Sequence, residues 1–346
     1  MVINKAKGFV RFFSLAVLFV TFFLISAHQP ALAEDTEEDG KFNPSELIMH
    51  HVVDDHKWHF FDGHFGTLHL PIIVYSKTKG LDVFSSSNFY DEHHHTVDYN
   101  GYHLEHNKIS LVGDETSVYD FSISKTVLML FIVSLVLILI FTAVAKAAKR
   151  NKGKAPKGIQ SAIEPIVIYL RDEVIKPNIG PNYEKYLPYL LSLFFFIWIG
   201  NLLGLLPGAA NLTGNISITL VLAVFTFLIV NFNGNKNYWK HIFATPGVPA
   251  PILPMIVLVE IIGVFTKPFA LMIRLFVAIT AGHVVILSLI ALIFIFQSWS
   301  VGFGSTLVVV FINLIELLVA TIQAYVFTMF SALYIGLAIE EHHDDH

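Results

Sequence analysis

A single arginine limits the chemistry that this sequence could perform. Arg274 lies inside a long apolar stretch, residues 251–297. A cation in the middle of a bilayer costs roughly 3 kcal/mol even on lenient insertion scales, and arginine cannot lose its proton to escape that cost. Its partner is therefore expected to be a carboxylate, an anionic substrate or water. The alternative is an internal ion pair that only holds two helices together.

A second set of polar residues follows one stripe of the last apolar stretch, residues 306–339. Glu316 and Gln323 lie three and ten residues after Asn313, which places all three side chains on one face of a helix. His283 lies in the preceding apolar stretch. Glutamate and histidine can both take up and release protons, and inside membranes such groups mark proton paths.

The two long apolar stretches are expected to form an antiparallel helical hairpin, because only the short uncharged segment 298–305 joins them. Counted from the middle of that segment, Gln323 lies within about one turn of the level of Arg274, and Glu316 within about one turn of the level of His283. Arg274 and His283 point to roughly opposite faces of their helix, so direct contact of the second pair stays open. Both stretches are longer than one bilayer thickness, and Pro268 is the expected site of a bend.

The helix of Arg274 supplies no close carboxylate. Glu260, the acidic residue of this stretch, lies about four turns before Arg274. The missing partner is expected on another protein. A self-contained transporter or channel that binds an anionic substrate at Arg274 is the alternative, although no internal repeat of the transporter kind is visible.

Composition indicates a polytopic, all-α membrane domain. Of 346 residues 54% are hydrophobic and 14% are charged, which is too apolar for a soluble protein. The chain has no cysteine, no phosphate-binding glycine loop and no dinucleotide fingerprint, so we expect no cofactor. About five membrane helices are predicted, at residues 123–145, 186–206, 216–232, 251–297 and 306–339.

The polar segments between these spans predict the topology. A basic cluster after the first span places its end in the cytoplasm. Residues 159–175 are expected to form an amphipathic helix on that surface, and residues 176–182 are expected to break it. The C-terminus is then cytoplasmic.

The N-terminal part differs in character from the rest. Residues 1–33 have the basic start, apolar core and small-residue site of a signal peptide, with an uncleaved helix as the alternative. Residues 34–122 are acidic and rich in histidine, and their short apolar runs predict a small extracytoplasmic domain with β content. The run His93-His94-His95 is a candidate metal site, or a solvated loop whose charge depends on pH. Residues 123–346 form the membrane domain.

Several motifs in residues 120–340 resemble subunit a of the F-type ATP synthase, the membrane stator beside the rotating c-ring. The central one is the sequence from Lys267 to Phe276, KPFALMIRLF, followed by Ala281-Gly282. Supporting matches are GIQ at 158–160 with Glu164, NLLGLLP at 201–207, NISITL at 215–220, LVE at 258–260 and TIQAYVF at 321–327.

The resemblance implies a role for each matching residue. Arg274 corresponds to the arginine that faces the c-ring carboxylate, and Gln323 to the glutamine opposite it. Glu260 corresponds to the carboxylate of the cytoplasmic access path. His283 and Glu316 correspond to the outer access pair, with histidine and glutamate exchanged relative to some members. Asn313 precedes that pair on the same stripe.

One position departs from the family pattern, because Ala278 stands where asparagine is usual. The resemblance implies a proton-translocating subunit that is not catalytic alone, in a bacterial inner membrane, with the N-terminal domain in the periplasm. The implied partners are the c-ring proteolipids, the peripheral-stalk b subunits and the rest of the synthase, with no nucleic acid. A sodium-coupled version of the same subunit is the alternative.

Overall fold

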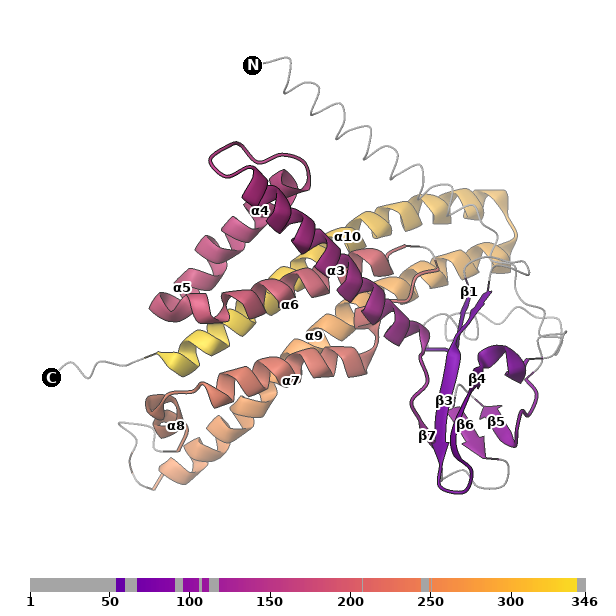
Figure 1. The fold of residues 1–346 in the computed structure, drawn as a ribbon, viewed down its shortest axis with the longest axis horizontal. Helices are drawn as coiled ribbons and strands as arrows, with labels where there is room; N and C mark the ends of the chain where they lie inside the picture. The colour runs from indigo at the N-terminus through magenta and orange to yellow at the C-terminus, as the bar shows by residue number, and fades with distance from the viewer. Residues whose placement is uncertain are drawn as a thin grey trace, which may run out of the picture. The chain divides into compact units, whose positions relative to one another are not determined.

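The fold is described from a computed structural model of the chain. It describes residues 54–59, 67–90, 96–105, 108–111, 118–206, 208–243, 249 and 251–340. The described residues form two compact units, Ile286–Phe311 and the rest. The predicted signal peptide, residues 1–33, lies outside the described residues. Figure 1 shows the strands gathered in the N-terminal part and the helices in the remainder.

The described residues between 54 and 122, here called the strand domain, contain short strands and so confirm the predicted β content. The strands pair antiparallel in three small sheets, ordered β1-β2, β4-β3-β7 and β5-β6. Their bounds are β1 (Lys57–His59), β2 (Thr67–His69), β3 (Pro71–Ser76), β4 (Gly80–Ser85), β5 (Tyr102–Glu105), β6 (Lys108–Leu111) and β7 (Val118–Asp120).

The sheet β4-β3-β7 buries one of its faces. Side chains alternate between the two faces of a strand, and Ile72 and Val74 of β3 point to the face that is fully buried. They pack with Phe89, Tyr102 and Leu104 to form a small separate core. This core gives the strand domain an apolar interior of its own.

The strand domain is anchored to the start of the first membrane helix, α3 (Lys125–Arg150). The carboxylate of Asp54 accepts hydrogen bonds from the Ser124 hydroxyl, at 2.7 Å, and from the backbone N–H of Thr126, at 3.1 Å. The first N–H groups of a helix have no partner inside the helix, so these bonds cap α3. In addition, the indole N–H of Trp58 donates to the backbone carbonyl of Gly208 at 2.6 Å.

After α3 the chain is helical from Ile159 to Gly204, through α4 (Ile159–Tyr169), a π-helical turn η2 (Leu170–Ile175), α5 (Lys176–Ile179), a 3-10 turn η3 (Gly180–Asn182) and α6 (Tyr183–Gly204). The predicted break at residues 176–182 begins too early. Lys176–Ile179 stays helical because Pro177 stands in the first turn of α5, where its missing N–H is tolerated. The break comes at Gly180, whose φ of 75° ends the helix.

The remaining elements complete the predicted set of apolar helices. They are α7 (Ile216–Phe232), α8 (Lys236–Phe243), α9 (Leu253–Phe296) and α10 (Trp299–Ile339). Four of the described helices are long and apolar enough to cross a membrane, or five if α7 and α8, bent by 100°, form one span. Pro268 lies inside α9, which stays a single helix. At 1.5 Å per residue α9 is about 66 Å long, roughly twice the hydrocarbon thickness.

The predicted connection at residues 298–305 is wrong in extent. Helix α9 ends at Phe296 and α10 begins at Trp299, so only Gln297 and Ser298 lie between them. Gln297 has a φ of 43°, a left-handed conformation that reverses the chain in one step. The glycines and serines of 298–305 suggested a longer loop, but all except Ser298 are helical.

Helix α10 is held by close contacts with α6 and α5. The side-chain amide of Asn201, which is 1% exposed, donates to the backbone carbonyl of Ala320 at 3.3 Å. Ala320 itself is fully buried, as expected for a small residue at a close helix approach. Gly336 is closer still: a Cβ there would lie 1.8 Å from the carbonyl oxygen of Asn178.

Candidate functional site

Arg274 lies in the middle of α9 and is exposed on the surface of the chain. Its guanidinium carbon lies 4.5 Å from the centre of the Phe330 ring on α10. A cation over an aromatic face gains about 0.5–2 kcal/mol, which offsets only part of the cost of placing it in a membrane. Within the described part of the chain, no carboxylate forms an ion pair with Arg274.

The contacts of α9 confirm the antiparallel hairpin. Along α9, Lys267 lies over the ring of Tyr334 at 5.7 Å, and Arg274 lies over that of Phe330. Residue numbers therefore fall along α10 as they rise along α9. Gln323 shares no hydrogen bond with Arg274 in the described structure.

His283 and Glu316 are brought together, which answers the question that the sequence left open. Nδ1 of His283 lies 3.5 Å from Oε1 of Glu316. The side chain of Glu316 is 2% exposed and that of His283 is 31% exposed. Glu316 also approaches the backbone of α9 closely at Gly282, because a Cβ at this residue would lie only 3.1 Å from Oε1 of Glu316. Because Gly282 has no side chain, Glu316 has room to pack against this position.

Two oxygen atoms near this pair are buried without a hydrogen-bond partner in the described structure. They are Oε2 of Glu316 and Oγ1 of Thr280. A buried polar atom without a partner costs about 1–3 kcal/mol, so a hydrogen-bonding group such as water would be stabilised beside Oε2 of Glu316. Asn313, one turn before Glu316, is partly buried and makes no side-chain hydrogen bond among the described residues.

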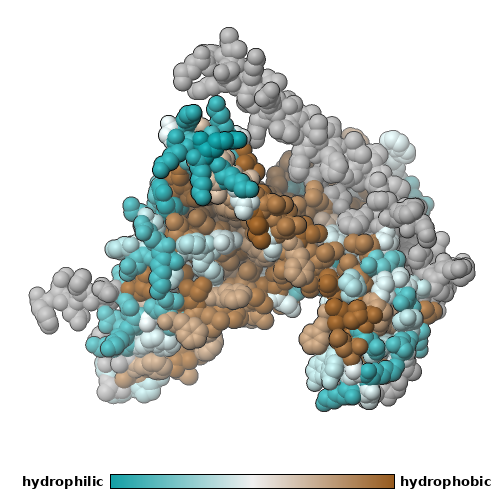
Figure 2. Space-filling model, viewed as in Figure 1, coloured by the Kyte–Doolittle hydropathy of each residue, from teal (hydrophilic) through white to brown (hydrophobic). Residues whose placement is uncertain are grey.

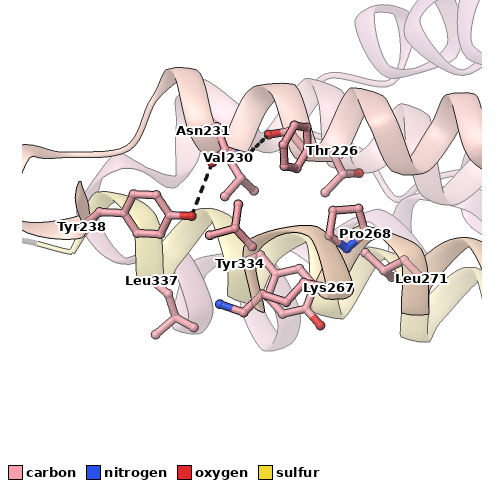
Figure 3. Close-up of a pocket in the computed structure, with 11 residues that line it drawn as sticks. Thr226, Val230, Asn231, Tyr238, Lys267, Pro268, Leu271, Tyr334 and Leu337 are labelled. Atoms are coloured by element: carbon pink, nitrogen blue, oxygen red, sulfur yellow. Dashed lines mark hydrogen bonds between the residues drawn. The ribbon is translucent and has the colours of Figure 1, made fainter. Parts of the chain in front are cut away.

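A pocket lies on the other side of Arg274 along α9, between α7, α8, α9 and α10. Figure 3 shows Lys267 and Tyr334 on one wall and Tyr238 with Asn231 on the other. The hydroxyl of Tyr238 lies 3.5 Å from Oδ1 of Asn231. Glu260 does not line this pocket, but it is partly buried and close enough to Tyr238 for its charge to act there. The pocket therefore combines an apolar lining with several polar groups.

The described ranges contain no group of three or more histidine, aspartate or glutamate side chains placed to hold a metal ion. The metal candidates His93, His94 and His95 lie outside those ranges.

Comparison with known proteins gives the family. Residues 127–336, more than half of the chain, match the family described as ATP synthase A chain. The chain belongs to this family. Members of the family are the membrane stator subunit of the proton channel Fo, which is not catalytic by itself, in the H⁺-transporting ATP synthase. This chain is therefore a multi-pass membrane protein of that complex.

Three similar relatives align with 73% to 96% of this chain. "ATP synthase subunit a 2" of Chlorobaculum tepidum is 40% identical over 93% of this chain and 79% of its own. A protein of the same name from Prosthecochloris aestuarii is 39% identical over 96% of this chain and 94% of its own. "ATP synthase subunit a" of Chlorobium phaeobacteroides is 45% identical over 73% of this chain and 76% of its own.

The N-terminal region has its own match. Residues 47–128 match a family described only as a domain of unknown function. Because two of the relatives align with 93% and 96% of this chain, those alignments include most of residues 34–122. The strand domain is therefore shared by these relatives and is not peculiar to this chain.

Two functional neighbours were missed by the sequence reasoning. Phe330 lies seven residues after Gln323, two turns along the same face of α10, and its apolar ring was not considered when only the polar residues of α10 were followed. Gly282 was noted only as part of a motif. Its role depends on a contact between two helices, for which one sequence carries no signal.

Proposed function

We propose that Arg274 meets the ionisable carboxyl group of a c-ring subunit and couples its protonation to rotation of the ring. One observation carries the proposal: a permanently charged, exposed guanidinium in the middle of an apolar helix, with an aromatic ring beside it and no ion pair to a carboxylate of the described residues. Such a cation is stabilised when an oppositely charged group arrives from another chain.

The surface of α9 around Arg274 suits a neighbouring helix. Ala270, Val277 and Ala281 are exposed four residues before, three after and seven after Arg274, on the same side of the helix. Small residues let two membrane helices approach closely. A ring helix packed along this stripe would bring its carboxyl group to the guanidinium.

His283, Glu316 and Asn313 are proposed to form the outer proton path. His283 lies nine residues, about 13 Å, beyond Arg274 toward the end of α9. Glu316 can hold a proton on its unpartnered Oε2, and His283 at 3.5 Å can pass one to it or take one from it. From here the proton reaches the ring carboxylate, which then becomes neutral and can enter the lipid.

Glu260 and the pocket of Figure 3 are proposed to form the cytoplasmic path. Glu260 lies fourteen residues, about 21 Å, before Arg274. The two proposed paths therefore open on opposite sides of Arg274. The positive charges of Lys267 and Arg274 favour release of the proton from the ring carboxyl group toward Glu260.

Arg274 also separates the two paths. A fixed cation repels a proton that would pass directly from one path to the other, so protons cross only on the moving ring. Gln323 on α10, seven residues before Phe330, is proposed to orient the guanidinium or the ring carboxyl group when the ring is present.

The topology belongs to the same proposal. Lys149 and Arg150 in the last turn of α3, with the lysines that follow, support a cytoplasmic position for this end of α3. The strand domain is then periplasmic, after a signal peptide at 1–33, and the C-terminus is cytoplasmic. The peripheral-stalk b subunits and the c-ring are the proposed direct partners, in a bacterial inner membrane.

Cysteine cross-linking tests the proposed ring contact, since this chain has no cysteine of its own. Val277→Cys, on the exposed stripe, should form a disulfide with a cysteine placed beside the ring carboxyl group. Leu275→Cys is the matched control, because Leu275 is 1% exposed and packs in this chain's own core. Cross-linking at Leu275→Cys but not at Val277→Cys would contradict the proposed orientation of α9.

A further inference from the structure

The sheet β4-β3-β7 is apolar on both faces, although only one face is covered by the domain's own core. The inner face carries Ile72 and Val74, each fully buried. The two charged side chains of the sheet also have partners: Asp82 accepts a hydrogen bond from the hydroxyl of Tyr102 at 2.7 Å, and Asp120 lies 3.3 Å from His56. Both charged side chains of the sheet therefore lie on the inner face and have partners there.

The outer face is exposed and carries no charge. The strand register places Tyr75 beside both Leu81 and Tyr119, and Ile73 beside Val83. Phe121 continues the face, because its N–H donates to the carbonyl of Ile73. The exposed fractions are 64% for Leu81, 63% for Val83, 66% for Phe121, 53% for Tyr119 and 43% for Tyr75.

A face of this kind is not expected against water. The solvated face of an antiparallel sheet is normally polar, in alternation with the buried face. In this sheet, the residues of both faces are mainly apolar. Figure 2 shows the corresponding apolar surface among the polar surface of the strand domain.

The position of this face in the chain indicates what covers it. Phe121 lies four residues before Lys125, where α3 begins. The cap that Asp54 provides and the bond from the indole of Trp58 to Gly208 attach the domain to the ends of α3 and α6. The outer face is therefore held close to the point where α3, the first membrane helix, meets the bilayer surface.

We propose that the outer face of the sheet β4-β3-β7 rests in the lipid headgroup region of the leaflet in which α3 begins. Tyrosine and phenylalanine are suited to this region, which accepts apolar rings and polar hydroxyl groups together. The absence of charge on the face agrees with a lipid surface and gives no pattern for electrostatic recognition of a protein. The inference is independent of the proposed proton path.

Fluorescence quenching tests the contact with lipid. Single-cysteine variants Val83→Cys and Leu81→Cys, made in the assembled synthase with other reactive cysteines removed, would carry an environment-sensitive fluorophore. Lys108→Cys is the control, because Lys108 is exposed on β6 in the same domain and outside this sheet. The complexes are placed in nanodiscs of phosphatidylcholine and phosphatidylglycerol with a headgroup-level spin-labelled lipid.

The expected result is loss of most of the fluorescence at both Val83→Cys and Leu81→Cys on adding the spin-labelled lipid, with little loss at Lys108→Cys. Iodide, which stays in the aqueous phase, should quench strongly at Lys108→Cys and weakly at Val83→Cys and Leu81→Cys. Quenching by iodide at all three positions would overturn the proposal, because the face would then be in water. Protection of the two face positions from both quenchers would also overturn it, and would assign the face to a protein partner.

Discussion

The contact between Gly282 and Glu316 predicts a defect that one added methyl group should produce. A Cβ at Gly282 would lie 3.1 Å from Oε1, 3.2 Å from Cδ and 3.4 Å from Cγ of Glu316. These distances are tighter than ordinary contacts, and the carboxylate is buried, so it must move within a packed site. Overpacking of this kind costs about 1–3 kcal/mol.

The expected loss of pumping rate depends on how far this energy raises the barrier to proton transfer. If Glu316 carries the proton, its displacement raises the barrier to proton transfer, and 1–3 kcal/mol corresponds to a rate roughly 5- to 150-fold lower. We expect Gly282→Ala near the lower end and Gly282→Val near the upper end. The measurement is ATP-driven acidification of vesicles containing the reconstituted synthase, with subunit content checked by gel.

Gly263→Ala is the matched control on the same helix. A Cβ at Gly263 would have no atom within 4 Å, and both substitutions raise helix propensity by about 1 kcal/mol. Shortening the acid in Gly282→Ala/Glu316→Asp should recover part of the lost rate, a coupling that independent sites would not show. Equal acidification rates for Gly282→Val and Gly263→Val would refute the role given to this contact.

Three further predictions concern packing and the strand domain. Gly336→Ala should lower the amount of assembled subunit, because its Cβ would overlap a backbone carbonyl of α5 at 1.8 Å; normal assembly after thermal challenge would contradict this. Asn201→Leu should destabilise the subunit by about 1–3 kcal/mol, measured by denaturant-dependent loss from the complex, because it leaves buried partners on α10 and in the following loop without hydrogen bonds. Burial would raise the pKa of Asp120, but hydrogen bonds from His56 and Ser122 outweigh it and hold that pKa below its usual 3.8. The stabilisation by Asp120 is therefore present above that pH and lost as pH falls through the lowered pKa, so hydrogen exchange should separate Asp120→Asn from wild type near neutral pH and not in strong acid.

Helix geometry predicted much of the hairpin, because the period of an α-helix is fixed. Counting from the connection placed Glu316 level with His283, and the structure brings them to 3.5 Å. The direct contact between His283 and Glu316 could not be predicted from the faces of the helices on which they lie. It depends on how closely Glu316 of α10 approaches Gly282 of α9. The length of the connection was predicted wrongly because glycine and serine favour loops locally, whereas packing extends α10 back to Trp299.

The cation–π contact shows a second limit. Counting residues placed Gln323 within about one turn of Arg274, but in the described structure the guanidinium lies over Phe330, seven residues further along α10. In the strand domain, the alternation of apolar residues indicated strands. It could not indicate that one sheet would be apolar on both faces, since register is set by pairing among distant segments.

The central claim is that Arg274 acts on a carboxyl group of another chain, and ATP-driven proton pumping of the Arg274→Ala synthase tests it most directly. Arg171→Ala is the matched control, because Arg171 is paired within its own chain, with its guanidinium 2.8 Å from Asp172. Arg274→Ala is expected to abolish pumping in fully assembled complexes, whereas Arg171→Ala should pump normally. Unimpaired pumping by Arg274→Ala would contradict it.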